Sequence, residues 1–266
     1  MTMPDVASDS SPQEKAATLR SLHVAGKPLV LPNAWDAASA RMVEETGFSV
    51  VATSSFATAG ILGYADGEEA PVDEVLAAAA QIVRAVRLPV TVDMERGYGL
   101  APAELVARLA ATGAVGLNLE DSDPSTRTMI DPEEQADFLA TVRAAGVSAG
   151  VDLVINARTD SFLHRVGSSE EQLAASIDRG GRYLAAGADC VYPIGASDAD
   201  VIGALVEGIP GPVNVGYGRG TLSLAELAAL GVARVSFGPS LQLHLYETFR
   251  SDLLSAVASG RNPFAS

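Results

Sequence analysis

The stretch Leu31-Pro32-Asn33-Ala34-Trp35-Asp36 follows the first short apolar run of the chain and separates two possible α/β architectures. A doubly wound open sheet usually carries a glycine-rich phosphate-binding turn after its first strand. This stretch contains no glycine, so the open sheet is disfavoured. A closed parallel barrel is the other architecture in which strands and helices alternate along the whole chain.

Eight strand–helix units follow one another in the sequence. Short apolar runs, mostly introduced by Gly or Pro, have the length and composition of buried strands; they span residues 28–31, 49–53, 89–93, 115–119, 152–156, 189–192, 212–215 and 234–237. Apolar residues recur at helical spacing in the segments 37–45, 73–86, 102–111, 132–145, 170–186, 198–207, 224–230 and 241–258. Eight such units in about 250 residues predict an α/β protein with the (β/α)8 TIM-barrel fold.

Little of the chain lies outside these units. Residues 1–11 are small, polar and acidic, and we expect a flexible N-terminus there. Residues 12–25 have helical spacing, which predicts one extra helix before the barrel. No linker or shift in composition divides the remainder, so residues 12–266 are expected to form a single barrel domain.

The composition argues against several classes of protein. The 266 residues include 33 acidic and 18 basic side chains, a net charge of −15, which disfavours binding to nucleic acid or to an anionic membrane surface. Neither a membrane-spanning apolar run nor a signal peptide is recognisable, so a cytoplasmic location is predicted. The single cysteine, Cys190, lies within a strand pattern and is expected to be an inert core thiol.

Acidic side chains follow the third and fourth predicted strands. Asp93 ends the third strand and Glu95 follows it, and Glu120 and Asp121 follow the fourth. Neighbouring strands lie about 5 Å apart, so these carboxylates should converge at the end of the barrel where active sites form. Close carboxylates repel each other unless a cation or protons neutralise them, and all-oxygen ligation suits Mg²⁺, with Mn²⁺ as a substitute. On position alone, ion pairs with arginines or helix caps are the alternative.

Arg158 follows the fifth predicted strand closely. A planar guanidinium at the barrel mouth suits bidentate capture of a carboxylate or phosphonate. The alternative is a structural ion pair with Asp160 or Glu120. His164 lies further past the same strand and is expected to be a surface loop residue.

Ordered motifs on successive strands resemble those of the isocitrate lyase and phosphoenolpyruvate mutase superfamily, over nearly the whole chain. The matching segments are 32–41 (PNAWDAASAR), 53–55 (TSS), 62–67 (LGYADG), 92–99 (VDMERGYG), 119–121 (LED) and 157–160 (ARTD). In the fourth of these segments, Glu95 stands where the family signature has a second Asp. The resemblance implies a (β/α)8 barrel that acts on small 2-oxo carboxylates.

The resemblance also implies a set of site residues. Mg²⁺ would be held directly by Asp93 and through water by Asp66, Glu95 and Glu120. The implied substrate-binding residues are Trp35, Ser54, Ser55, Phe56, Asn156 and Arg158.

The segment after the fourth strand departs from the family pattern. Residues 121–129 (DSDPSTRTM) lack the catalytic Cys of isocitrate and methylisocitrate lyases, and they also lack the Lys and Asn-Ser-Leu segment of phosphonomutases. Tyr192-Pro193 stands where a mutase would have a His after the sixth strand. Proton delivery would then fall to a hydroxyl such as that of Tyr64 or to water, and Arg127 in this loop is expected to contribute to catalysis.

These features together predict a Mg²⁺-dependent C–C bond lyase or decarboxylase that acts on a small 2-oxo carboxylate through a metal-stabilised enolate. The alternatives are a mutase or hydrolase of P–C bonds acting on a phosphonopyruvate-like substrate, and a non-catalytic 2-oxo acid binding protein. Members of the superfamily assemble as tetramers, often with the last helix exchanged between barrels. The resemblance therefore implies a homotetramer in which residues 241–258 pack on a partner subunit.

Overall fold

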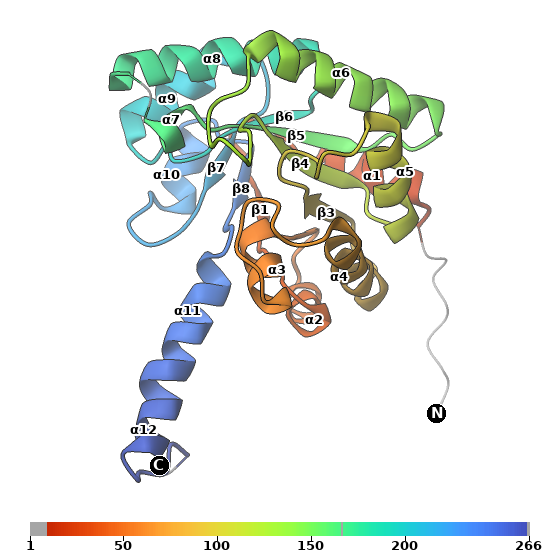
Figure 1. Ribbon diagram of the computed structural model, residues 1–266. Helices are drawn as coiled ribbons and strands as arrows, with labels where there is room; N and C mark the ends of the chain where they lie inside the picture. The colour runs from red at the N-terminus through yellow and green to blue at the C-terminus, as the bar shows by residue number, and fades with distance from the viewer. Residues whose placement is uncertain (1–9, 166, 265–266) are drawn as a thin grey trace.

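A closed ring of parallel strands forms the centre of the protein, whose computed structural model describes residues 10–165 and 167–264 (Figure 1). The strands are β1 (Leu29–Leu31), β2 (Val51–Ala52), β3 (Val90–Asp93), β4 (Gly116–Glu120), β5 (Val154–Thr159), β6 (Cys190–Pro193), β7 (Asn214–Gly216) and β8 (Arg234–Ser236). Strands β2 to β6 pair in chain order, and β8 pairs with both β7 and β1. Parallel bridges from Asn33 to Ala52 and from Val191 to Val213 join these two sheets, so the ring closes. The predicted barrel is confirmed.

Helices cover the outside of the ring, as expected for this fold. They are α1 (Pro12–Ser21), α2 (Ala37–Glu45), α3 (Ser55–Leu62), α4 (Val72–Ala85), α5 (Pro102–Thr112), α6 (Pro132–Ser148), α7 (Ser161–His164), α8 (Ser169–Ala185), α9 (Ala199–Gly208) and α10 (Leu224–Ala229). Local sequence explains several of their ends. Ser168 and Ser223 each begin a helix with a reciprocal capping box, and Gly113 ends α5 in the left-handed conformation that favours glycine.

Two short helices of the site were not predicted. The first, α3, is apolar around most of its surface and lacks the one-sided pattern that marks a helix, and Ser54 gives it no side-chain cap. The second, α7, has only four residues. The extra helix α1 was expected to reach residue 25 but ends at Ser21. Residues 1–9 of the expected flexible N-terminus lie outside the described residues.

The C-terminal segment extends away from the barrel instead of packing against it (Figure 1). It consists of α11 (Ser240–Thr248), one π-helical stretch (Phe249–Leu254) and α12 (Ser255–Ala258), where a single helix was expected. We call residues 240–258 the C-terminal arm. Side-chain contacts tie it to the barrel: Gln242 Nε2 donates to the carbonyl oxygen of Ala57 at 3.2 Å, and Arg219 Nη2 lies 3.4 Å from Glu247 Oε2.

A buried arginine lies inside the barrel near its N-terminal end. Arg234 on β8 is fully buried, and its Nη1 lies 3.4 Å from Nε2 of His23. Because His23 Nδ1 contacts the carbonyl oxygen of Leu19 at 2.9 Å, Nδ1 carries the proton and Nε2 is left to accept from Arg234. Burial and the facing charge of Arg234 lower the pKa of His23 to about 4.

No helix among the described residues is both long and apolar enough to cross a bilayer.

Candidate active site

The carboxylate of Asp93, at the end of β3, is hydrogen-bonded to the start of α3. Asp93 Oδ2 accepts a hydrogen bond from the backbone N–H of Ser55 at 2.9 Å, and the backbone N–H of Asp93 donates to Thr53 Oγ1 at 3.0 Å. Parallel pairing of β2 with β3 brings these residues together, because Ala52 is in register with Thr91. The acidic group expected to bind metal directly therefore sits at the N-terminus of a helix, where backbone N–H groups favour negative charge.

The second carboxylate after β3 is buried and fastens a separate loop. Glu95 is 3% exposed; its Oε2 accepts from the backbone N–H of Glu68 at 2.8 Å and its Oε1 from the hydroxyl of Tyr98 at 2.5 Å. Glu68 in turn accepts from the backbone N–H groups of Arg96 and Tyr98. Burial raises the pKa of Glu95 to about 7, and the charges of Asp93 and Asp66 add to this effect. Glu68 has no counterpart among the predicted site residues.

An ion-pair network spans the ends of β4 and β5. Arg158 Nη1 lies 2.6 Å from Glu120 Oε2, while Nε and Nη2 of Arg158 contact the two oxygens of Asp160 at 2.6 and 3.1 Å. Burial raises the pKa of Glu120 well above its usual range, against the lowering effect of Arg158. Three of the five guanidinium N–H groups are used in these contacts, so two remain for a ligand. The ion pairs considered for Arg158 from sequence are present.

The four carboxylates expected at a metal site influence one another. Burial raises the pKa of Asp66, and the charge of Asp93 raises it further. Asp93 likewise raises the pKa of Glu95 and of Glu120. Within residues 10–165 and 167–264, no three acidic, His or Cys side chains are close enough to ligate one ion together. This donor set fits a divalent cation with one direct protein ligand and water-mediated contacts to the others, since Mg²⁺ typically keeps several waters.

The predicted substrate-binding residues fall into two groups. Ser54 and Ser55 are buried beside Asp93, and Phe56, on the same turn, is about half exposed. The backbone N–H of Ser55 is already used by Asp93 and its side chain is hydrogen-bonded to Asp66, which leaves the hydroxyl of Ser54 for a substrate. Asn156 lies deeper, inside the barrel, where its Nδ2 donates to Asn118 Oδ1 at 2.9 Å.

Two further predicted residues are placed at the periphery. Trp35 lines a surface groove together with Met42 and Leu241. The hydroxyl of Tyr64 donates to Glu74 Oε1 at 3.1 Å, and the ring is exposed. In the part of the chain that the structure describes, neither side chain is hydrogen-bonded to the carboxylates that follow β3 and β4.

The loop after β4 is an ordered hairpin. An antiparallel bridge joins Ser122 to Met129, and Asp123 Oδ1 accepts from the backbone of Ser125 and Thr126 inside the turn. The Ser125 hydroxyl and these N–H groups lower the pKa of Asp123 to about 2. Arg127 lies at its tip with its side chain exposed. We refer to residues 121–130 as the β4 hairpin.

Buried polar contacts hold the base of this hairpin. Asp121 is completely buried; it accepts from the backbone N–H of Asp160 at 2.9 Å, from the Tyr183 hydroxyl at 2.6 Å and from Arg179 Nη1 at 3.0 Å. Sequence reasoning missed Tyr183 and Arg179, which lie on α8 about sixty residues further on, and no local motif signals such a long-range partner. These contacts fix the point from which the hairpin projects over the barrel mouth.

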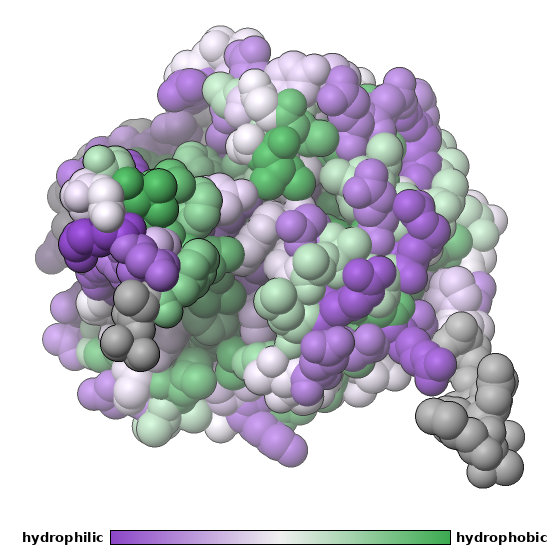
Figure 2. All heavy atoms as spheres, turned by 90° about the horizontal axis from the view of Figure 1, so that it is seen from below, coloured by the Kyte–Doolittle hydropathy of each residue, from purple (hydrophilic) through white to green (hydrophobic). Residues whose placement is uncertain are grey.

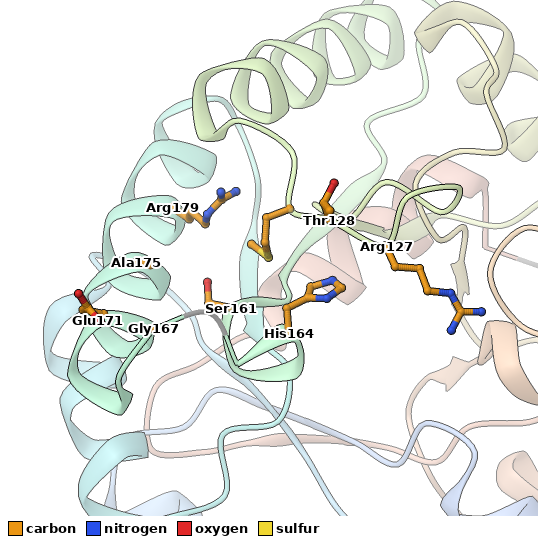
Figure 3. A pocket seen from close by; sticks show the side chains of 9 residues that line it. Arg127, Thr128, Ser161, His164, Gly167, Glu171, Ala175 and Arg179 are labelled. Carbon is orange, nitrogen blue, oxygen red and sulfur yellow. The ribbon is translucent and has the colours of Figure 1, made fainter.

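A cavity of about 640 Å³ lies between this hairpin and helices α7 and α8 (Figure 3). Its lining residues are Arg127, Thr128, Met129, Ser161, His164, Gly167, Glu171, Ala175 and Arg179. His164 was expected on the surface, but it is half-buried and its Nε2 lies 2.7 Å from Ser122 Oγ.

A parallel (β/α)8 barrel with carboxylates and an arginine at the carboxyl ends of β3, β4 and β5 is the architecture of a TIM-barrel enzyme. The profile of the phosphoenolpyruvate phosphomutase family matches residues 19–257, and the chain belongs to this family. It is an enzyme of the phosphoenolpyruvate mutase/isocitrate lyase superfamily, as the resemblance predicted.

Individual relatives carry different names. A crystal structure from Burkholderia cenocepacia, with the provisional name phosphonomutase, superposes with a TM-score of 0.87 at 44% identity and covers 94% of this chain and all of that one. The 2-methylisocitrate lyase of Bacillus subtilis is 28% identical over 78% of this chain and 69% of its own. Oxaloacetate decarboxylase 2 of Pseudomonas putida is 29% identical over 76% of this chain and 66% of its own. Relatives of this chain are therefore named both for enzymes that cleave C–C bonds and for an enzyme that acts on phosphonates.

Proposed function

We propose that the protein is a Mg²⁺-dependent lyase or decarboxylase that breaks a C–C bond next to the 2-oxo group of a small carboxylate. The observation that carries the proposal is the arrangement of Asp93, Glu120 and Arg158 on three adjacent strands, with two guanidinium N–H groups of Arg158 left for an anion. Such a site binds a dianion beside a cluster of negative charge, which is the arrangement that an enolate-forming reaction needs once a cation is bound.

Different residues would bind the metal ion and the substrate. Asp93 would ligate the ion directly, and Asp66, Glu95 and Glu120 would contact its waters. When bound, Mg²⁺ (or Mn²⁺) would polarise the 2-oxo group and stabilise negative charge that develops on its oxygen. Arg158 would hold the carboxylate of the substrate.

The substrate would be enclosed from two sides. The hydroxyl of Ser54, at the start of α3, would position its carboxylate, and the β4 hairpin would cover it, with Arg127 near the opening. Exclusion of water by such a loop strengthens the electrostatic contacts inside and protects the enolate from unproductive reactions.

A P–C mutase or hydrolase is the second candidate, because the family name and the Burkholderia structure both point to phosphonate chemistry. Two features weigh against it. The β4 hairpin contains no Lys or Asn, and Tyr192-Pro193 ends β6 where a mutase would have a His. The buried ring of Tyr192 cannot supply a cationic partner for a phosphoryl group.

The two candidates make different products. We would incubate the protein with Mg²⁺ and either oxaloacetate, its 3-alkyl derivatives or phosphonopyruvate, and follow CO₂, 2-oxo acid and phosphate release. The proposal expects C–C cleavage of at least one dicarboxylate and no phosphate. Phosphate release from phosphonopyruvate would favour the second candidate, and tight binding of 2-oxo acids without any turnover would contradict both.

We further propose that the C-terminal arm joins subunits of a cytoplasmic homotetramer. The arm exposes many large apolar side chains. In Figure 2 the arm points towards the viewer at the left. The exposed apolar side chains on it include Leu243, Leu245, Tyr246, Phe249, Leu254 and Val257. Exposed apolar patches of this kind mark protein interfaces. Light scattering should show a tetramer for the wild type and smaller species for Leu245→Asp/Phe249→Asp; a monomeric wild type would contradict the proposal.

A further inference from the structure

We propose that Glu68 is a positioning residue for the metal site, because it holds together the two loops that carry Asp66 and Glu95. This role rests on the proposed Mg²⁺ site and adds a residue that shapes the site without touching the ion. Asp66 and Glu68 lie in the loop between α3 and α4, whereas Glu95 follows β3. The contact between these loops therefore decides where two of the four carboxylates lie relative to each other.

Glu68 binds the second loop through both its backbone and its side chain. Its backbone N–H donates to Glu95 Oε2 at 2.8 Å. In the opposite direction, its Oε1 accepts from the backbone N–H groups of Arg96 and Tyr98 at 3.0 and 2.7 Å. The reciprocal pattern is that of a capping box, in which carboxylate and hydroxyl side chains exchange hydrogen bonds with backbone N–H groups. We call these three hydrogen bonds the Glu68 clasp. Bonds in both directions restrict the two loops to one relative placement.

The backbone at the Glu68 clasp adopts conformations that need such support. Glu68, Glu95 and Tyr98 have φ of 60°, 47° and 54°, in the left-handed region that residues other than glycine rarely adopt. Conformations of this kind persist only where surrounding contacts fix them, and they concentrate at functional sites. All three residues take part in the clasp, so its hydrogen bonds offset the backbone strain at each of them.

The clasp also fixes the carboxylate of Glu95. This side chain is buried, and its Oε2 accepts from Glu68 while its Oε1 accepts from the hydroxyl of Tyr98 at 2.5 Å. Because water is largely excluded, these hydrogen bonds face little competition. A carboxylate oxygen has two acceptor positions, so each oxygen keeps one for a water molecule of the ion. The Glu95 carboxylate is therefore already in place before an ion binds.

Glu68 lies beside the acidic cluster and does not belong to it. Burial raises the pKa of Glu68, and the main charges that act on it are those of Arg96, which lowers it, and Asp123, which raises it. Neither residue is one of the four carboxylates that influence one another at the proposed metal site. One oxygen of Glu68 is moreover occupied by two backbone N–H groups. Glu68 therefore acts on the cluster through Glu95 and through the loop of Asp66.

Loss of the Glu68 clasp should weaken metal binding more than catalysis. Asp93, the proposed direct ligand, is held by the backbone N–H of Ser55, and Asp66 is hydrogen-bonded to the side chain of Ser55. These contacts do not involve Glu68, so Asp93 stays in place when the clasp is broken. The loop of Asp66 loses an attachment, and binding of an ion that demands near-octahedral geometry becomes weaker by the cost of ordering this loop. Affinity for Mg²⁺ should therefore fall while kcat at saturating Mg²⁺ changes little.

Two substitutions of Glu68 separate the effect of position from the effect of charge. Glu68→Asp keeps the negative charge but withdraws the oxygen by one methylene group, whereas Glu68→Gln removes the charge but keeps an acceptor oxygen at the same reach. Calorimetry with Mg²⁺ and no substrate should show an affinity about 10–100-fold lower in Glu68→Asp, the scale for residues that hold metal ligands. Glu68→Gln should stay near the wild-type affinity. Glu69→Asp, at the exposed neighbouring glutamate, is the matched control and should bind as the wild type does.

Steady-state kinetics supply a second readout. The Mg²⁺ concentration for half-maximal rate should rise in Glu68→Asp by the same factor as Kd, with kcat at saturation nearly unchanged. Tighter binding by Glu68→Asp than by Glu68→Gln would show that Glu68 acts by charge and would overturn the positioning role, as would wild-type affinity in Glu68→Asp. Absence of Mg²⁺ binding by the wild type would instead overturn the proposed metal site and, with it, the proposed function.

A measurement without metal tests the clasp itself. In the metal-free protein, amide hydrogen exchange followed by nuclear magnetic resonance should be slow at Arg96 and Tyr98, faster in Glu68→Asp and slow in Glu68→Gln. Fast exchange at these two amides in the wild type, or equal protection in Glu68→Asp, would contradict the clasp whatever the Mg²⁺ affinity of the variants.

Discussion

Glu120 on β4 and Arg158 on β5 are register partners, and their side chains form an ion pair of 2.6 Å at the mouth of the barrel. Parallel pairing of neighbouring strands therefore places a buried carboxylate against a buried guanidinium. Asp160, which follows the last residue of β5, contacts the other edge of the same guanidinium. The arginine is thereby fixed in one orientation, which is the condition for bidentate capture of a substrate.

Replacement of Asp93 should abolish metal binding and turnover together. Asp93→Asn keeps the shape of the side chain but removes the charge of the proposed direct ligand, so we expect turnover to fall by several orders of magnitude, about the scale of lost Lewis-acid stabilisation. Calorimetry would measure Mg²⁺ affinity, with Asp200→Asn, an exposed carboxylate on α9, as control. Unchanged affinity in folded Asp93→Asn would contradict the site assignment.

Mg²⁺ affinity should depend on pH through Glu95. Its pKa of about 7 is raised above the usual value, so below pH 7 the carboxyl holds a proton that competes with the ion, and above pH 7 it does not. Affinity should therefore fall by up to about tenfold per pH unit below 7 and level off above it. Titrations in buffers of different ionisation heat would count the released proton. A flat profile in the wild type, or the same slope in Glu95→Gln, would refute this assignment.

Arg158→Lys should weaken substrate recognition although the charge is kept. A lysine ammonium cannot reproduce the planar contacts with both oxygens of Asp160 and with Glu120. We expect kcat/KM for dianionic substrates to fall by a factor equivalent to about 1–3 kcal/mol. Steady-state kinetics and urea unfolding would be measured together. Wild-type kcat/KM would rule out the clamp, and an unfolded variant would show that Arg158 is only structural.

Substitution of Arg127 should lower the activity of the enzyme, whereas substitution of Cys190 should leave it nearly unchanged. Arg127→Ala removes an exposed cation at the tip of the β4 hairpin and should lower activity without affecting unfolding. Cys190→Ser changes a fully buried thiol within β6, outside the proposed site, and should leave kcat/KM nearly unchanged. Loss of activity in Cys190→Ser with folding preserved would contradict the placement of this thiol outside the proposed site.

His23 should make the stability of the protein sensitive to acid. Its pKa of about 4 in the folded state lies below the value of about 6.5 in an unfolded chain, so only the unfolded chain binds a proton between these values. The contribution of His23 to the free energy of unfolding is fully present above pH 6.5. It should decrease by up to about 3 kcal/mol as pH falls towards 4. His23→Gln, which can still accept from Arg234, should lose this part of the pH dependence in urea unfolding. An unchanged slope would show that other groups carry it.

Several features could be predicted from the sequence because they are local. The alternation of short apolar runs with helical segments gave the strand order of a closed barrel, since each strand in a parallel barrel pairs with its neighbours in the chain. The same rule placed Asp93, Glu120 and Arg158 at one end, because the residues after parallel strands always meet at one edge. The ordered motifs on successive strands, residues 92–99 among them, together indicate the family.

Other features depend on contacts between distant segments, which no local pattern encodes. Ser122 and His164 are forty-two residues apart, and only the closure of the β4 hairpin against the short helix α7 brings them within 2.7 Å. Glu68 reaches the backbone of Tyr98 because its own loop folds over the end of β3. The direction of the C-terminal arm likewise depends on tertiary structure. The helical pattern of residues 241–258 predicts a helix. Whether that helix packs on its own barrel depends on which apolar surface is available to cover the helix.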